Sequence, residues 1–205
     1  MVKNSPSLPA IYQLQNTKPI VRLGVVADTH IPDRMKALPP RVLELLAGVD
    51  LILHAGDICR PGVLDELRCV APVVAVMGNR DIWYRANHTL PMKLIIEVGQ
   101  VKIGLTHGHG GLLGYIKEKL IFFTTGFYAF RRYERRARTW FDGVDAIVFG
   151  HTHYPVNRLR NGQLLFNPGS VGPDYRAKFG ASLGRLTVNT AEKRIVGEIL
   201  PIQSP

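Results

Sequence analysis

Residues 21–30, VRLGVVADTH, join a short apolar run to a cluster of polar side chains. The run from Val21 to Ala27 is rich in β-branched residues and has the length of a buried β-strand. Asp28, Thr29 and His30 follow directly, at the point where this strand should end. The stretch therefore predicts a buried strand whose carboxyl end carries polar side chains, which is where open α/β sheets place their ligands.

The same pattern, an apolar run followed by a polar cluster, occurs four more times along the chain. These later clusters are Gly56-Asp57, Gly78-Asn79-Arg80-Asp81, Thr106-His107-Gly108-His109 and Gly150-His151-Thr152-His153. Taken singly, each has an ordinary interpretation, because a lone histidine is usually structural and Gly-Asp or Gly-Asn is usually a turn. Most of the seven histidines lie in these clusters. Together they favour one shared site at the carboxyl ends of five strands.

The rest of the chain predicts strands that first alternate with helices and later pair as hairpins. Helices are expected after Pro39-Pro40 and over 61–70, between strand-like runs at 51–54 and 72–77. This alternation is typical of parallel strands joined by crossover helices. The later strand candidates are 93–98, 101–106, 146–149, 163–166, 182–188 and 194–200. We expect early parallel strands and late antiparallel ones, in two sheets packed together.

The residue types in the five clusters indicate a metal site. Imidazole and carboxylate groups suit Mn, Fe, Zn, Co or Ni, and Mn is the favoured ion here. Cys59 and Cys69 have no metal-binding or redox spacing and are expected to be reduced thiols. The candidate metal ligands are Asp28, His30, Asp57, Asn79, His107, His151 and His153. Seven protein ligands are too many for one tetrahedral ion, so the set predicts two divalent metal ions that share a carboxylate.

The length of 205 residues predicts one domain over 21–205, preceded by an N-terminal extension at 1–20. No apolar run reaches the ~20 residues of a transmembrane segment, and no secretion signal is evident, so a cytoplasmic location is expected. The formal net charge of +10 favours anionic partners, a phosphate ester or nucleic acid among them. Residues 112–140 hold seven Lys or Arg against two Glu, so half of that charge is local.

The order Asp-x-His, Gly-Asp, Gly-Asn, His-Gly and Gly-His-x-His, spread over residues 21–200, resembles the calcineurin-like metallophosphoesterases. The nearest resemblance is to a small bacterial and archaeal phosphodiesterase subgroup related to a retromer scaffold subunit, whose closing motif resembles Asn167-Pro168-Gly169-Ser170. It implies an α/β fold, a four-layer α-β-β-α sandwich of two mixed β-sheets flanked by helices. It further implies one ion on Asp28, His30, Asp57 and His153, and another on Asp57, Asn79, His107 and His151, with Asp57 bridging.

The resemblance also implies a mechanism, in which a hydroxide bridging the two ions attacks phosphorus in line. One position departs from the pattern, because many members have histidine after Gly-Asn to protonate the leaving group, and this chain has Arg80. A guanidinium donates protons poorly but can clamp phosphate. Arg80 is therefore expected to stabilise charge, with protonation weak or supplied by His109 or Asp81. The plainer alternative is that Arg80 pairs with Asp81 or another surface carboxylate.

A basic aromatic helical insertion is expected at about 112–141. Phe123, Phe127, Phe130, Ala137 and Phe141 share one helical face, interrupted by Glu134, and arginines cover another. This face could pack on the domain, form a homo-oligomer contact or a cap over the metal site, or bind a membrane surface or nucleic acid.

The function that these features favour is a metal-dependent phosphoric ester hydrolase, a phosphodiesterase more than a monoesterase. Its expected catalytic residues are Asp57, Asn79, Arg80 and His109. Two alternatives stay open: a non-catalytic metal-binding scaffold for protein interactions, and a nuclease. The complete ligand set argues against a scaffold, and only the basic charge supports a nuclease.

Overall fold

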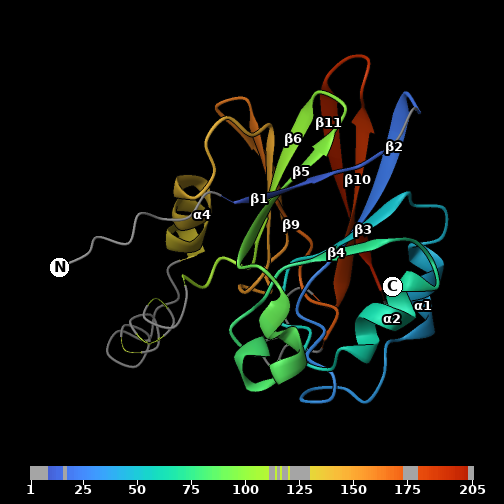
Figure 1. The fold of residues 1–205 in the computed structure, drawn as a ribbon, viewed down its shortest axis with the longest axis vertical. Helices are drawn as coiled ribbons and strands as arrows, with labels where there is room; N and C mark the ends of the chain where they lie inside the picture. Colours follow the sequence, from blue (N-terminus) through green and yellow to red (C-terminus); the bar gives the residue numbers. More distant parts are fainter. Residues whose placement is uncertain are drawn as a thin grey trace.

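The computed structural model describes residues 9–15, 18–110, 114, 116, 120, 130–172 and 180–202. Strand β2 (Ile20–Val26), which carries the opening apolar run, lies at the centre of a five-stranded sheet (Figure 1). The other strands of this sheet are β3 (Leu51–His54), β4 (Val73–Ala75), β10 (Ser182–Asn189) and β11 (Arg194–Pro201). Strands β2, β3 and β4 are parallel, whereas β10 pairs antiparallel with β2 and β11. The predicted order of parallel and closing antiparallel strands is therefore found.

The second sheet has six strands in the order β1-β5-β6-β7-β9-β8. They are β1 (Ala10–Gln13), β5 (Lys93–Val98), β6 (Val101–Thr106), β7 (Ala146–Phe149), β8 (Val156–Arg160) and β9 (Gln163–Asn167). Strands β5 and β6 form the predicted hairpin, and β6, β7 and β9 are parallel. The two edge strands, β1 and β8, were not predicted. Strand β1 lies within the assigned N-terminal extension, where it pairs with β5.

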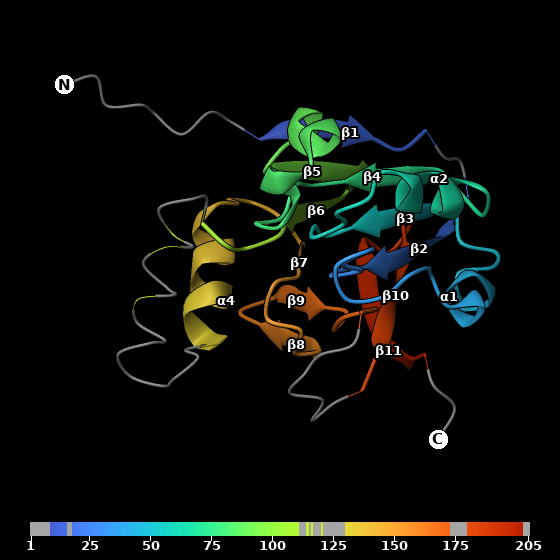
Figure 2. The same cartoon turned by 90° about the horizontal axis from the view of Figure 1, so that it is seen from below.

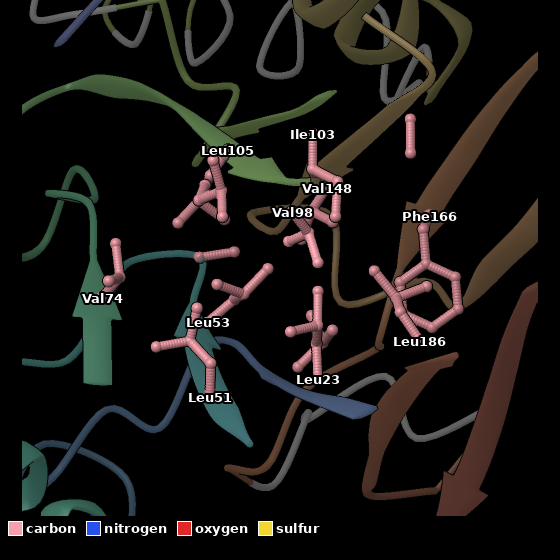
Figure 3. Packing of buried hydrophobic residues seen from close by; sticks show 14 of the residues in the cluster. Leu23, Leu51, Leu53, Val74, Val98, Ile103, Leu105, Val148, Phe166 and Leu186 are labelled. Atoms are coloured by element: carbon pink, nitrogen blue, oxygen red, sulfur yellow. The ribbon is translucent and has the colours of Figure 1, made fainter. Parts of the chain in front are cut away.

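Buried aliphatic side chains from both sheets fill the space between them (Figure 3). Helices α1 (Pro40–Leu45) and α2 (Gly62–Arg68) cover the outer face of the five-stranded sheet through a second apolar cluster. Helix α4 (Phe130–Thr139) lies on the outer face of the six-stranded sheet (Figure 2). The protein is therefore a four-layer α-β-β-α sandwich, as the family resemblance implied. Two short 3₁₀ helices, η1 (Asp81–Trp83) and η2 (Arg85–Thr89), follow β4.

The insertion packs on the domain where the structure describes it. Ala137 and Phe141 are buried against Ile147 of β7 and its neighbours. A Cβ at Gly104 of β6 would lie 2.6 Å from Phe141 Cγ, so the small residue admits this ring. The predictions for Phe123 and Phe127 fall outside the described residues. Within the part of the chain that is described, no helix is both long and apolar enough to cross a membrane.

Candidate metal centre

All seven candidate ligands follow strands, and both sheets contribute to the same site. Asp28 and His30 follow β2, Asp57 follows β3, and Asn79 follows β4. From the other sheet, His107 follows β6, and His151 and His153 follow β7. Their side chains gather in two neighbouring groups, so the convergence predicted from the five clusters is found.

The first group surrounds the Nε2 atom of His30. This atom lies 3.7 Å from Asp28 Oδ1, 3.7 Å from Asp57 Oδ2 and 3.2 Å from His153 Nε2. His153 Nε2 is in turn 3.3 Å from Asp28 Oδ1. Asp28, His30 and Asp57 are buried, and His153 is partly buried. Three of the four, Asp28, His30 and His153, have the mutual spacing of metal ligands.

The second group surrounds the Nε2 atom of His107. It lies 3.4 Å from Asp57 Oδ1 and 3.1 Å from Asn79 Oδ1. His151 Nδ1 lies 2.8 Å from Asn79 Oδ1 and 3.2 Å from His107 Nε2. Asp57 thus belongs to both groups, with Oδ2 facing the first and Oδ1 facing the second.

The donor atoms fit divalent cations in both spacing and chemistry. Nitrogen and oxygen ligands about 2.0–2.2 Å from a tetrahedral ion lie about 3.4 Å from one another, which is the spacing of both groups. Asp28 Oδ1 is buried yet accepts no hydrogen bond from any described residue. A buried carboxylate oxygen without a donor is costly, and a cation between it and His30 would satisfy it.

Backbone geometry at these residues is uncommon and directs the side chains inward. Five of the seven candidate ligands have a left-handed backbone, with φ of 54° at Asp28, 51° at His30, 56° at Asp57, 69° at His151 and 55° at His153. Each such residue costs about 1–3 kcal/mol and persists only where its surroundings hold it. Such residues cluster at functional sites, so the strain supports a binding role for these loops.

The two carboxylates of the site remain ionised at neutral pH in spite of their burial. Burial raises the pKa of Asp57, but His107, His30 and the backbone N–H of Arg80 lower it far below its usual value. Burial likewise raises the pKa of Asp28, but His153 outweighs it and the pKa falls to about 2. The site therefore offers two buried negative charges to a cation.

The histidines of the two groups differ in their protonation. Burial lowers the pKa of His30 to about 4, so its imidazole is neutral. Burial also lowers the pKa of His107, but the Asp57 carboxylate more than offsets this and the pKa is raised to about 9. His107 Nδ1 donates to the carbonyl of Ala55 at 2.7 Å, which turns Nε2 toward Asp57. A cation in the second group would take the place of the proton on that nitrogen.

Hydrogen bonds between side chains and the backbone fix the loops that carry the ligands. The His151 N–H donates to Asp28 Oδ2 at 3.0 Å, which links the loops after β7 and β2. The Ser170 hydroxyl donates to the Asp28 carbonyl at 3.0 Å, and Asn167 Nδ2 donates to the Gly150 carbonyl at 2.9 Å. Asn167 and Ser170 therefore hold the ligand loops in place from behind.

Asp81 is the centre of a hydrogen-bond network that the sequence did not reveal. Its carboxylate is fully buried and accepts five N–H groups. The donors are the backbone N–H groups of Asp57, Ile58, Cys59 and Gly78 and the side-chain amide of Asn87. Burial and the charge of Asp57 raise the pKa of Asp81, and the N–H donors oppose them. Both oxygens are engaged in joining two ligand loops, which leaves neither directed at the ligand groups.

Arg80 lies beside the second group and is held by a carboxylate that no sequence motif distinguishes. Its Nη2 donates to Asp33 Oδ2 at 2.6 Å, and its backbone N–H donates to Asp57 Oδ1 at 2.7 Å. The Tyr84 hydroxyl donates to the other oxygen of Asp33 at 2.5 Å, which raises the pKa of Tyr84 to about 12. Arg80 thus pairs with a carboxylate, as the plainer alternative expected, and it does so next to the ligands.

His109 also lies in the cluster, with its ring centroid 5.3 Å from that of His107 and 6.3 Å from that of His151. It is fully buried, and neither ring nitrogen has a hydrogen-bond partner among the described residues. Burial, with His107 and His151 adding to it, lowers the pKa of His109 to about 3. Its imidazole is therefore neutral at neutral pH, and the one N–H that it keeps is a weak acid for protonating a leaving group.

Helix α4 reaches the site through one of its faces. The buried Tyr133 ring lies 4.8 Å from the His151 ring, and Arg136 Nη1 donates to the Gly108 carbonyl at 3.2 Å. The insertion therefore contacts two of the ligand loops as well as the sheet.

The fold and the site together define the class of this protein. It is an α/β sandwich in which the strand ends of two sheets converge on two groups of carboxylate, amide and imidazole groups suited to metal ions. The chain belongs to the calcineurin-like phosphoesterase superfamily, whose domain matches residues 21–191. It is 36% identical to a probable metallophosphoesterase of Methanothermobacter thermautotrophicus over 148 residues, which are 72% of this chain and 76% of the relative.

Solved structures of similar fold include proteins with different names. Vacuolar protein sorting 29 from Cryptosporidium parvum matches with a TM-score of 0.63 and 22% identity, over 88% of this chain and 96% of that one. An archaeal phosphodiesterase matches with a TM-score of 0.52 and 21% identity, over 88% of this chain and 100% of that one. At these identities the likeness concerns the fold.

Proposed function

We propose that this protein is a phosphodiesterase that uses two divalent metal ions, with manganese favoured. The observation that carries the proposal is Asp57, whose two oxygens face two separate groups of ligands. Asp28, His30, Asp57 and His153 would hold one ion, and Asp57, Asn79, His107 and His151 the other. When bound, such a pair of ions supplies an activated water near neutral pH and offsets negative charge on phosphoryl oxygens.

The protein's own groups would position the ester beside that pair. Arg80 keeps its charge at every accessible pH, and its planar fork suits two phosphoryl oxygens. Asp33 holds the guanidinium near Asp57 while 42% of the Arg80 side chain stays exposed to an entering ester. Asn79 adds a neutral oxygen to the second group, so the site keeps net positive charge for an anionic substrate once ions are present.

A diester is favoured over a monoester by two considerations. The archaeal structural neighbour is itself described as a phosphodiesterase. Neither His109 nor Asp81 is suited to protonate the leaving oxygen, since the pKa of His109 is lowered to about 3 and the oxygens of Asp81 accept N–H groups. A non-catalytic scaffold is the second candidate, favoured by the likeness to vacuolar protein sorting 29. The complete set of seven candidate ligands favours the enzyme.

The proposal is tested first by the metal content and the reaction of the purified protein. Elemental analysis is expected to find two divalent ions per chain. A chromogenic diester and the corresponding monoester should be assayed with Mn, Ni, Zn and Mg after chelation. Faster turnover of the diester, restored by Mn, is the expected result. Two bound ions without hydrolysis of either ester would favour the scaffold.

Loading the second group with metal is expected to release about one proton per chain at pH 7.5. The pKa of His107 is raised to about 9 in the metal-free protein, so Nε2 is protonated there, and only the neutral imidazole can bind a cation. Titration calorimetry in two buffers of different ionisation enthalpy measures the number. The release should fall away as the pH rises through about 9. A heat that does not depend on the buffer at pH 7.5 would contradict this assignment.

Hydrolysis is expected to slow steeply as the leaving group becomes more basic. A rate that falls as the pKa of the leaving group rises indicates that the leaving group departs without receiving a proton. A series of aryl diesters with leaving groups of graded acidity measures the slope of log kcat/KM. The His109→Asn variant should show the same slope as the unaltered protein. A flat series would mean that a group of the protein protonates the leaving oxygen. A slope that becomes steeper in His109→Asn would assign that role to His109.

A further inference from the structure

A basic cavity lies on the far side of helix α4 from the candidate metal centre. A cavity of about 740 Å³ is lined by Arg135 and Arg138 of α4 and by Arg158, Leu159 and Arg160 of β8. Figure 2 shows α4 beside strands β8 and β9 at one edge of the six-stranded sheet. We call this cavity, defined by these five residues, the arginine groove.

The arginine groove is formed by two elements held at a fixed separation. Arg158 pairs with the buried Glu134 of α4, and Arg138 Nε donates to Gln163 Oε1 of β9 at 3.3 Å. These contacts explain why Glu134 interrupts the apolar face of the helix. They tie α4 to the sheet edge, so the guanidinium groups converge on one space.

The charge in the arginine groove is largely uncompensated. Arg135 and Arg160 are exposed, and within the described ranges neither has an ion-pair partner. Four guanidinium groups against the single carboxylate of Glu134 leave a net charge of +3. Like charges so close repel one another, and a polyanion between them would relieve that repulsion.

The groove is separate from the metal centre because of the direction of the strands. In the pairing of β8 with β9, Val156 lies opposite Asn167, which contacts the ligand loops, and Arg160 lies opposite Gln163. Arg160 lies four residue steps along the strand from Val156, a distance of about 13 Å. A ligand in the groove would therefore leave the metal centre accessible.

We propose that the arginine groove binds a compact anion carrying two or more phosphoryl groups. Guanidinium forks bind phosphoryl oxygens two at a time, and four of them suit several such groups. The volume of the cavity is within the range of roughly 300–1,000 Å³ of small-ligand sites, which favours a small polyphosphate over an extended polymer. This site is independent of the proposed hydrolysis.

Titration calorimetry with inorganic tripolyphosphate in a buffer without divalent cations tests the proposal. The Arg135→Gln/Arg160→Gln variant is expected to bind roughly a hundredfold more weakly, at about tenfold for each guanidinium that is removed. Arg132→Gln/Arg194→Gln is the matched control, since it removes the same charge from exposed positions of α4 and β11 outside the groove. It should bind within about twofold of the unaltered protein, after allowance for screening.

Asp57→Asn separates this site from the metal centre and should leave tripolyphosphate affinity unchanged. Equal binding by the groove variant and the unaltered protein would overturn the proposal. So would a changed affinity in Asp57→Asn, in either direction, which would place the anion at the metal centre. A single-stranded oligonucleotide and vesicles containing acidic lipid form the remaining arms. If the oligonucleotide or the vesicles bound through the groove while tripolyphosphate did not bind, the proposal would also be overturned, in favour of an extended anionic partner.

Discussion

Replacing Asp57 with Asn is expected to lower kcat/KM for a phosphodiester by about a thousandfold or more. The amide keeps the size of the side chain but removes the charge that faces both ligand groups at 3.7 Å and 3.4 Å. A pair of catalytic ions lowers the activation barrier by several kcal/mol, and each 1.36 kcal/mol is about tenfold in rate. Elemental analysis should find the metal content reduced from two ions to one or none.

Asp65→Asn is the matched control for this substitution. Asp65 is an exposed carboxylate of α2 that pairs with Arg68, away from the ligand loops. Its loss should change neither metal content nor rate. If Asp57→Asn kept both ions and the full rate, Asp57 would not be shared between two ions and the proposed function would fail.

The same substitution has a second, independent readout in the metal-free protein. Burial lowers the pKa of His107, and the Asp57 carboxylate is the main reason that this pKa is nevertheless raised to about 9. Without that charge burial is less opposed, and the pKa of His107 should fall from about 9. Nuclear magnetic resonance titration of the imidazole measures this directly. A pKa still near 9 would mean that another group holds the proton on His107.

The members of the site could be predicted from sequence because their chemistry is carried by few residue types. Carboxylate, amide and imidazole groups directly after apolar runs indicate a ligand site at the carboxyl ends of strands, before the arrangement of the strands is known. Strand β7 and the adjacent His151 and His153 are such a case, since the strand has the predicted bounds 146–149. The division of the seven ligands into two groups came from the family resemblance. In the structure His30 Nε2 lies 3.2 Å from His153 Nε2, and His107 Nε2 lies 3.1 Å from Asn79 Oδ1.

The groups that position those ligands could not be predicted, because their roles depend on long-range approach. Asp33 meets Arg80 across 47 residues, and the Ala55 carbonyl meets His107 across 52. Nothing in the residues near Asp33 distinguishes it from any surface aspartate. The close fit at Gly78, where a Cβ would lie 2.1 Å from Asp57 Oδ1, is likewise visible only in three dimensions.

Strands were predicted well where both faces are buried and poorly at sheet edges. The residues of β3 and β7 are all buried, and their bounds match the apolar runs. In β8 four of five residues are exposed, including two arginines, so hydrophobicity gives no strand pattern. Strand β1 is also largely exposed, and its four residues are defined by pairing with β5.

Replacing Asp81 with Ala is expected to lower the free energy of unfolding by about 3–5 kcal/mol, among the largest effects of any single change. The methyl group would leave five buried N–H groups without an acceptor, four of them on the backbone. For a chain of this size the melting temperature should fall by about 10 °C. Differential scanning calorimetry of the metal-free protein measures the change.

Asp142→Ala serves as the control, because Asp142 is an exposed aspartate that takes no part in this network. It should melt within about 1 °C of the unaltered protein, as exposed substitutions usually do. An equally small change in Asp81→Ala would show that water or a neighbouring group can satisfy the five N–H donors.

The loss at Asp81 should reach the metal centre without removing any ligand. Two of the five donors are the N–H groups of Asp57 and Gly78, so the carboxylate joins the loop that carries Asp57 to the loop that carries Asn79. Replacing a group that positions metal ligands through hydrogen bonds usually lowers metal affinity by about 10–100-fold. Asp81→Asn keeps one acceptor oxygen and should lie between Asp81→Ala and the unaltered protein in both stability and affinity. If Asp81→Ala bound metal with full affinity while melting lower, the network would serve the fold alone.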